Sequence, residues 1–313
     1  MKSMLRSLFD TIEVLLRFLY YSLEELILKF SCYKKNVAGK IVLITGSANG
    51  IGRELAIQFA RLGSILVLWD IDEEGNNETG ELAKANGALA VCAYRCDVGK
   101  REEIYAVAEQ VRREVGDVDI LINNAGILKG KTFLDLSDSD LEETLDVNTA
   151  SHFWTCKAFL PAMVARNEGH LVTTASVSSL VGSNKLTATT ASKYATFGFM
   201  EALAFELQDA GKKGIQTTIV CPYLVDTELI TGAQTLREFF FPILDAGYVA
   251  KEMVDAILKE KLYLVLPSYA RLLVLKIFFP KKIVYLLAEY LGLFRLFDHF
   301  RGEPKRGQKT KEN

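Results

Sequence analysis

Residues Lys40–Gly52 read KIVLITGSANGIG, an apolar run followed by a turn that holds three glycines. The helix-forming residues RELA follow at positions 53–56. A pyrophosphate needs backbone N–H donors and the positive end of a helix, and glycine lets the main chain approach it closely. The stretch therefore predicts a dinucleotide-binding turn made by Gly46, Ser47, Asn49, Gly50, Ile51 and Gly52. A plain tight turn between a strand and a helix is the simpler alternative.

A second apolar run, Ile65–Trp69, ends on Asp70, about twenty residues beyond the glycines. A carboxylate at this place accepts hydrogen bonds from the adenosine ribose hydroxyls and repels a 2′-phosphate, so it favours NAD over NADP. Acidic residues also follow it at positions 72–74. A solvated aspartate at a strand end is therefore the competing interpretation.

Apolar runs alternate with amphipathic stretches along the middle of the chain. They cover Lys40–Thr45, Ile65–Asp70, Leu89–Cys96, Ile120–Asn123, His170–Ala175, Thr217–Cys221 and Leu262–Val265. Runs that are apolar throughout indicate strands covered on both faces, and Arg101–Val115 shows the period of a helix packed on one side. We expect an α/β fold with one Rossmann-type, doubly wound parallel sheet of about seven strands and helices on both faces. Ligands of such sheets bind at the carboxyl ends of the strands.

Composition describes an ordinary globular protein. Half of the 313 residues are hydrophobic, and 37 basic residues nearly balance 39 acidic ones, so nothing favours nucleic acid as a partner. The cysteines are five and scattered: Cys32, Cys92, Cys96, Cys156 and Cys221. The Cys92–Cys96 pair lacks the second pair or the histidines of a zinc site, so we expect reduced thiols and no metal.

The segment 37–268 resembles a short-chain dehydrogenase/reductase. The resemblance rests on the turn Thr45–Gly52 and on Asp97, Asn123, Asn124, Ala125, Gly126, Asn148, Ser176, Lys193 and Pro222. The whole chain is most similar to membrane-associated retinol dehydrogenases of the epidermal type and to lipid-droplet 17-beta-hydroxysteroid dehydrogenases. That closer likeness is carried by the stretches 36–39, 59–64, 68–70 and 158–163.

The resemblance implies a role for each matching position. Asp97 accepts from the adenine amino group, Lys193 binds the ribose, and Thr227 reaches the nicotinamide carboxamide. Small residues lie against the cofactor after the fourth strand, and a proline fixes the turn after the sixth: Asn124, Ala125, Gly126 and Pro222. The family forms dimers through helices that correspond here to 148–160 and 192–207, so a homodimer is expected.

Oxidation of an alcohol requires a base for the hydroxyl proton. In the family this base is a tyrosine four residues before the lysine, with a serine that holds the substrate oxygen and an asparagine that supports a water relay. Ser176, Lys193 and Asn148 fit these places, but position 189 is a threonine. A phenol ionises near pKa 10, whereas an aliphatic hydroxyl ionises several units higher and is no free base near neutral pH.

Thr189 leaves two interpretations. Tyr194 points about 140° around the helix from position 189, so it is a poor substitute for the missing phenol. Thr189 can still hold the substrate oxygen, and a water bound by Thr189, Lys193 and Asn148 can relay a proton slowly. The chain is then either an NAD-dependent dehydrogenase of retinol, a steroid or another lipid alcohol with weak turnover, or a nucleotide-binding pseudoenzyme or scaffold.

Apolar segments occur within the dehydrogenase-like region and on both sides of it. Leu224–Tyr248 is the expected substrate lid, and its Phe239–Phe241 cluster indicates either an apolar substrate or core packing. In segment 1–36 a helical stripe is interrupted by charges, which indicates an interfacial helix rather than a span; packing on the body or a partner is the alternative. The stripe comprises Leu5, Leu8, Ile12, Leu15, Leu19, Leu23 and Leu26.

The segment 269–313 repeats apolar groups between lysines and ends in a short basic tail. Long basic side chains beside apolar faces can reach lipid head groups, although a basic terminus is more often simply solvated. Together with the family likeness, both ends favour attachment to the endoplasmic reticulum or a lipid droplet, with the body facing the cytosol.

Overall fold

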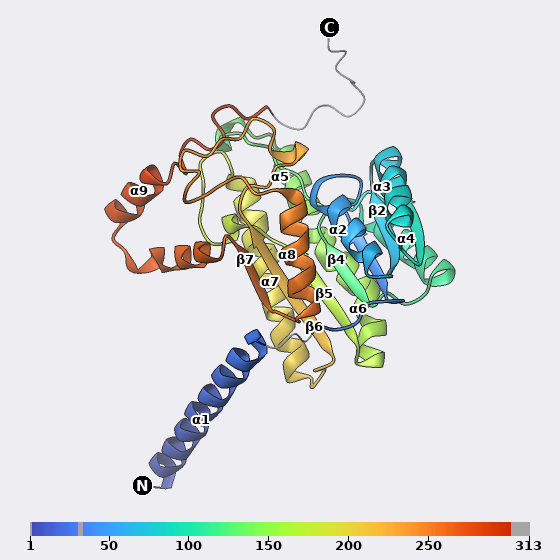
Figure 1. Ribbon diagram of the computed structural model, residues 1–313. Coiled ribbons are helices and arrows are strands. Elements are labelled where there is room, and N and C mark those ends of the chain that lie inside the picture. Colours follow the sequence, from blue (N-terminus) through green and yellow to red (C-terminus); the bar gives the residue numbers. More distant parts are fainter. Residues whose placement is uncertain (1, 31–33, 302–313) are drawn as a thin grey trace. The chain divides into compact units, whose positions relative to one another are not determined.

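The computed structural model describes residues 2–30 and 34–301 (Figure 1). Cys32 and the basic tail after residue 301 lie outside the described residues. The chain divides into two compact units, 1–36 and 37–313. The first unit holds one long helix, α1 (Lys2–Phe30). Its described stripe residues Ile12, Leu15, Leu19 and Leu23 are exposed, while the side chains of Leu5, Leu8 and Leu26 lie outside the description.

The second unit is built on one parallel sheet in the order β3-β2-β1-β4-β5-β6-β7. All six pairs of neighbouring strands are parallel, which confirms the predicted doubly wound α/β architecture. The strands are β1 (Ile41–Thr45), β2 (Ile65–Asp70), β3 (Ala90–Arg95), β4 (Ile120–Asn123), β5 (Gly169–Thr174), β6 (Ile215–Pro222) and β7 (Tyr263–Leu266). Each of the seven apolar runs in the sequence forms one of them.

Helices cover both faces of the sheet (Figure 1). One face carries α2 (Gly50–Arg61), α3 (Glu73–Ala85) and α8 (Ala246–Leu258), whose apolar side chains share one core cluster. The other carries α4 (Arg101–Glu114), α6 (Ser151–Arg166) and α7 (Thr187–Asp209). Shorter elements are η1 (Phe133–Asp135), α5 (Asp138–Leu145), η2 (Asp146–Ala150), η3 (Val177–Ser179), η4 (Glu228–Ile230), η5 (Ser268–Phe278) and α9 (Lys281–Tyr290).

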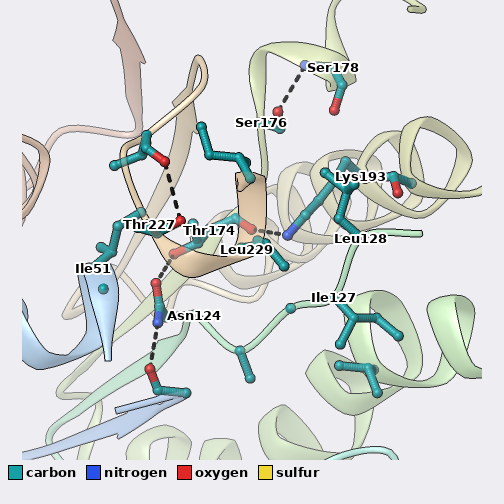
Figure 2. A pocket seen from close by; sticks show the side chains of 18 of the residues that line it. Ile51, Asn124, Ile127, Leu128, Thr174, Ser176, Ser178, Lys193, Thr227 and Leu229 are labelled. Atoms are coloured by element: carbon teal, nitrogen blue, oxygen red, sulfur yellow. Dashed lines mark hydrogen bonds between the residues drawn. The ribbon is translucent and has the colours of Figure 1, made fainter. Parts of the chain in front are cut away.

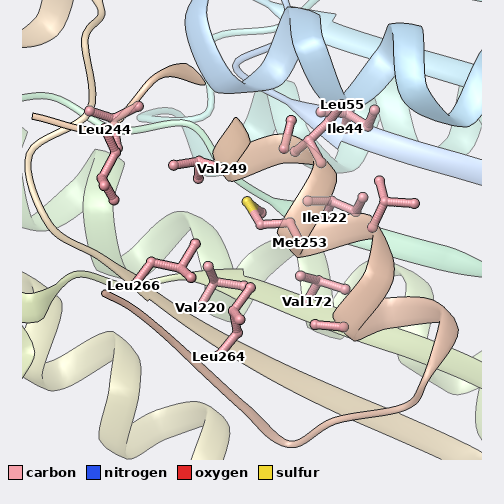
Figure 3. Packing of buried hydrophobic residues seen from close by; sticks show 14 of the residues in the cluster. Ile44, Leu55, Ile122, Val172, Val220, Leu244, Val249, Met253, Leu264 and Leu266 are labelled. Atoms are coloured by element: carbon pink, nitrogen blue, oxygen red, sulfur yellow. The ribbon is translucent and has the colours of Figure 1, made fainter. Parts of the chain in front are cut away.

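Neighbouring residues of a strand pack into the two cores on opposite faces of the sheet, which explains why the strands are apolar throughout. Ile44 belongs to the cluster under α8, together with Val249 and Met253 of that helix (Figure 3). Leu43, one residue earlier, belongs to the cluster under α4, α6 and α7. Both side chains are fully buried, and each such burial contributes roughly 1.5–3 kcal/mol to folding. The two cores fix the sheet and leave its carboxyl edge for polar groups.

The expected lid follows β6. A bridge joins Val225 to Leu244, the short helix η4 lies between them, and α8 already begins at Ala246. The Phe239–Phe241 cluster is split: Phe241 is buried against Tyr223, whereas Phe239 and Phe240 are exposed. Core packing and surface exposure are therefore both present in the cluster.

Candidate active site

A cavity of about 1480 Å³ opens at the carboxyl edge of the sheet. Most of the sequence-predicted site residues line it: Gly46, Asn49, Gly50, Ile51, Asp70, Asp97, Asn124, Ala125, Gly126, Ser176, Thr189, Lys193, Pro222 and Thr227. Three of them, Ser47, Gly52 and Asn148, do not belong to the lining. The fold thus brings residues from six strand ends and from α7 to one place.

The turn after β1 is built from close backbone contacts. A Cβ on Gly46 would lie 2.8 Å from the Ala125 Cα, and a Cβ on Gly52 only 1.9 Å from the Gly46 carbonyl oxygen. Gly46 and Gly50 also have positive φ angles of 67° and 51°, which glycine adopts without strain. Asn49, the N-cap of α2, makes no side-chain cap hydrogen bond, so its side chain does not occupy the N–H groups of the first turn of α2. Gly52 thus acts in packing, not by lining the cavity.

Hydrogen bonds of Ser47 and Asp70 hold this turn in place. The Ser47 hydroxyl donates to the Asn76 side-chain oxygen at 2.7 Å. The Asp70 carboxylate accepts from the Ala48 and Asp72 amides, both at 2.9 Å, and is only 8% exposed. The interpretation of Asp70 as a solvated strand-end residue is therefore wrong. Asp70 is thus a fixed, buried carboxylate in the cavity wall.

The segment after β4 is tied to the turn after β1. The Thr45 hydroxyl oxygen accepts from the amides of Asn124 and Ala125, at 3.0 and 3.1 Å. The Asn124 side-chain amide donates to the main-chain oxygens of Thr45 and Gly46. Asp97, after β3, is half-buried and accepts from the Gly99 amide at 3.0 Å. These bonds place small residues along one wall of the cavity.

The opposite end of the cavity combines Ser176 after β5 with Thr189 and Lys193 on α7. The Ser176 hydroxyl accepts from the Ser178 amide and donates to the Pro222 oxygen. Lys193 Nζ points toward β5 and donates to the Thr174 main-chain oxygen at 2.7 Å (Figure 2). Thr189 lies one helical turn before Lys193 on the same face of α7 and is buried.

Asn148 lies beside this end rather than in it. It sits in the π-helical segment η2, where its side-chain oxygen accepts from the Ile127 amide at 2.8 Å. Its amide nitrogen donates to the Ile127 oxygen and to the Ser192 hydroxyl. The side chain thus fixes the segment after β4 against α7 from outside the cavity lining.

Burial controls the titration of this region. Desolvation lowers the pKa of Lys193 to about 8, opposed by the neighbouring Cys221 thiol. Burial, and then the Lys193 charge, lower the pKa of His152 to about 3, so this imidazole is neutral near pH 7. Burial likewise raises the pKa of Cys221 to about 12. The lysine is thus surrounded by uncharged groups.

No phenol takes the place of the missing tyrosine among the described residues that line the cavity. Tyr194 lies outside the lining; its hydroxyl oxygen accepts from Lys276 Nζ of η5 at 2.7 Å. Tyr223 belongs to the lining, but its hydroxyl is buried and burial raises its pKa to about 12. Neither tyrosine is placed to act as a base at the Thr189 position.

One part of the site is missing from the sequence prediction. Leu273, Leu291, Leu293, Leu296 and Phe297 line the cavity, although sequence reasoning assigned the apolar groups after residue 268 to lipid contact. The Ser183 hydroxyl donates to the Leu293 oxygen and Lys185 pairs with Asp298, so these contacts join residues more than 100 positions apart. Apolar periodicity was the only local signal, and it did not distinguish a cavity wall from a lipid-facing surface.

Similarity to known proteins agrees with this geometry. Residues 40–236 match the family model described as short chain dehydrogenase. The chain belongs to the short-chain dehydrogenase family. Epidermal retinol dehydrogenase 2 of Mus musculus is 50% identical over 274 residues, which cover 87% of this chain and 89% of the relative.

Two further relatives and one solved structure also match most of the chain. Short-chain dehydrogenase/reductase family 16C member 6 of Bos taurus is 48% identical over 303 residues, or 96% of each chain. Retinol dehydrogenase 10 of Homo sapiens is 38% identical and covers 89% of this chain and 90% of the relative. A solved short-chain dehydrogenase/reductase from Burkholderia phymatum, in complex with NAD, superposes with a TM-score of 0.71 at 28% identity, covering 81% of this chain and 96% of its own.

The chain is thus a short-chain oxidoreductase of an NAD(P)-dependent family, related to retinol dehydrogenases. Its residues fit such a coenzyme, because the turn at the start of α2 lines the cavity and the Asn49 side chain does not cap the first-turn amides of that helix. Gly46–Gly52 would hold the pyrophosphate, Asp70 the adenosine ribose and Lys193 the second ribose. When bound, the coenzyme supplies the hydride acceptor or donor.

Proposed function

We propose that this protein is an NAD-dependent dehydrogenase that interconverts a lipid alcohol, with all-trans-retinol as the best candidate, and its carbonyl. The buried Asp70 carboxylate at the cavity wall carries the coenzyme choice, because it faces the place where NADP would put its 2′-phosphate. Retinoid as substrate class is supported by the names of the relatives. The apolar wall from the C-terminal segment supports a lipid as well.

Four side chains have separate roles in the proposed reaction. Ser176 holds the substrate oxygen, while Lys193 and Thr227 orient the coenzyme. Thr189 provides a hydroxyl where the family has a phenol, and this hydroxyl can hydrogen-bond the substrate oxygen without acting as a free base. We infer that turnover is weak.

A catalytically impaired nucleotide-binding protein is the second candidate, and Thr189 is the observation that favours it. In that case the chain serves as a scaffold on membranes or as the partner of an active relative. The coenzyme turn would still bind its ligand, because none of its contacts involves position 189.

The two candidates separate in one assay. Membranes carrying the full chain are supplied with NAD and all-trans-retinol, and retinal is measured beside NADH binding by fluorescence. We expect slow oxidation, and a Thr189→Tyr variant should be at least about 100-fold faster. Thr187→Tyr, on the exposed side of α7, is the matched control and should change nothing.

Each outcome is informative. Equal and measurable oxidation by the unaltered chain and by Thr189→Tyr contradicts impairment. No oxidation by the unaltered chain together with a large gain in Thr189→Tyr favours the impaired protein. Absence of NADH binding in folded protein overturns both candidates.

We propose further that the protein lies on the endoplasmic reticulum or a lipid droplet as a homodimer, with its body toward the cytosol. No helix of the described residues has an apolar stretch long enough to cross a bilayer. Support comes from the C-terminal segment, where Ile277, Phe278 and Leu286 are well exposed near Lys281 and Lys282. Fractionation, protease accessibility and crosslinking test the three points, and recovery as free monomer in the soluble fraction contradicts them.

A further inference from the structure

Lys193 is the one cationic side chain of α7 that lines the cavity, and it is unusually isolated. It is 9% exposed, and its ammonium nitrogen donates a hydrogen bond to the Thr174 main-chain oxygen. Lysines on neighbouring segments have acidic partners: Lys129 pairs with Glu143, and Lys185 with Asp298. Within the described residues no carboxylate contributes to the electrostatics of Lys193.

The groups that face Lys193 are uncharged. From α6 comes His152, which is neutral, and from β6 the Cys221 thiol, which is protonated. The Thr174 carbonyl of β5 accepts a hydrogen bond from Nζ. Gly126, after β4, lies so close that a Cβ added there would be 3.6 Å from Nζ. An ammonium ion in such a place loses hydration and gains no counter-ion, so the neutral amine is favoured.

Thr189 changes what this amine can reach. It stands four residues before Lys193 on the same face of α7, and both line the cavity. A threonine side chain ends at Cγ2 and Oγ1, whereas a phenol would extend into the space between the lysine and the substrate. The short side chain of Thr189 therefore leaves space in the cavity beside Lys193 that a phenol would fill.

We propose that Lys193, as the neutral amine, is the catalytic base of this chain and accepts the proton of the substrate hydroxyl. This inference rests on the proposed function. The substrate O–H bond breaks, the proton forms a new N–H bond at Nζ, and the C–H electron pair leaves with its hydrogen to the oxidised nicotinamide coenzyme. The Thr189 hydroxyl hydrogen-bonds the substrate oxygen during the transfer.

The proton balance supports this assignment. Because burial lowers the pKa of Lys193 to about 8, the amine is neutral near pH 7 far more often than at the ordinary pKa of 10.5. General bases work best when their pKa lies near the working pH. Lys193 meets that condition and the Thr189 hydroxyl does not.

The first test needs no turnover. Competitive labelling of the full chain with acetic anhydride, followed by peptide mass spectrometry, gives the protonation midpoint of Lys193, with exposed Lys157 providing the reference curve. We expect a midpoint within about a unit of 8. A midpoint above 10 overturns the proposal, because the amine would then be charged during turnover.

The second test identifies the base directly. Lys193→Ala should lose at least about 100-fold in retinol oxidation, and Lys193→Arg should lose as much because a guanidinium stays charged. Small primary amines added to Lys193→Ala should restore activity, more strongly as their pKa rises. Rescue that does not depend on amine basicity, or activity retained by Lys193→Arg, assigns Lys193 a positioning role only and overturns the proposal.

The pH profile separates this inference from the proposed function. The unaltered chain should gain about tenfold in kcat per pH unit below 8 and level off above. Oxidation by Thr189→Tyr without oxidation by the unaltered chain overturns only the role of Lys193. If both proteins bind NADH and neither oxidises an alcohol, the dehydrogenase function itself fails, and the role of Lys193 with it.

Discussion

The turn after β1 and helix α7 line the same cavity, but different kinds of atoms determine what each region does there. At the turn, main-chain atoms make the contacts: Gly52 packs on the Gly46 carbonyl, and Asp70 accepts from two amides. On α7, side chains carry the chemistry, and Thr189 occupies its place without disturbing the helix. A backbone contact tolerates no added atom, whereas a side chain on a rigid helix can change the chemistry and leave the fold intact.

The largest effect is expected at Gly52. A Cβ in Gly52→Ala would meet the Gly46 oxygen at 1.9 Å, so the turn must shift and NADH affinity should fall by more than 100-fold, about 3 kcal/mol. Fluorescence titration measures the loss. Gly198→Ala on α7 is the control, because a Cβ there meets nothing within 4 Å and should stabilise the helix by about 0.5–1 kcal/mol. Normal NADH binding by Gly52→Ala would contradict the view that backbone contacts determine coenzyme binding at the turn.

The next effect is expected at Asp70. Asp70→Asn keeps an oxygen for the Ala48 amide but removes the charge that opposes a 2′-phosphate, so the preference for NAD over NADP should fall about 10- to 100-fold. Separate titrations with the two coenzymes measure the ratio. Glu81→Gln, on the exposed part of α3 outside the cavity lining, should leave it unchanged. An unchanged ratio in Asp70→Asn removes this carboxylate from coenzyme choice.

A smaller effect, of opposite sign, is expected at Lys193. The buried charge opposes folding, so Lys193→Met should raise the free energy of unfolding at pH 7 by about 1–3 kcal/mol. Because the folded-state pKa is lowered from 10.5 to about 8, the folded protein releases its proton first, and the cost to the unaltered chain disappears as pH rises through this window. The gain should therefore shrink between pH 8 and 10.

Urea unfolding at several pH values measures this gain. Lys157→Met, at an exposed position of α6, is the control and should stay within about 0.5 kcal/mol of the unaltered chain. A loss of stability in Lys193→Met at pH 7 would show that the ammonium group is well compensated in the folded protein.

The smallest effect is expected at Tyr194. Tyr194→Phe removes one acceptor of the Lys276 ammonium group at an exposed site and leaves the Leu180 carbonyl as another, so stability should change by less than about 1 kcal/mol. NADH affinity and retinol oxidation should both stay within about twofold. Kinetics of the membrane-bound variant measure this, and a tenfold loss of kcat would make Tyr194 a participant in the reaction.

The sequence by itself determined the sheet and its coenzyme edge. The apolar runs from Ile41 onward and the glycines at 46, 50 and 52 are recognisable in the sequence, since a fully apolar run indicates a strand covered on both faces and a glycine-rich turn before a helix indicates close backbone approach. The replacement at Thr189 was visible there too. The tertiary structure decided the burial of Asp70, the isolation of Lys193 and the cavity wall formed by Leu293 and its neighbours. Those properties depend on which side chains from distant segments surround a group, and a linear pattern does not specify them.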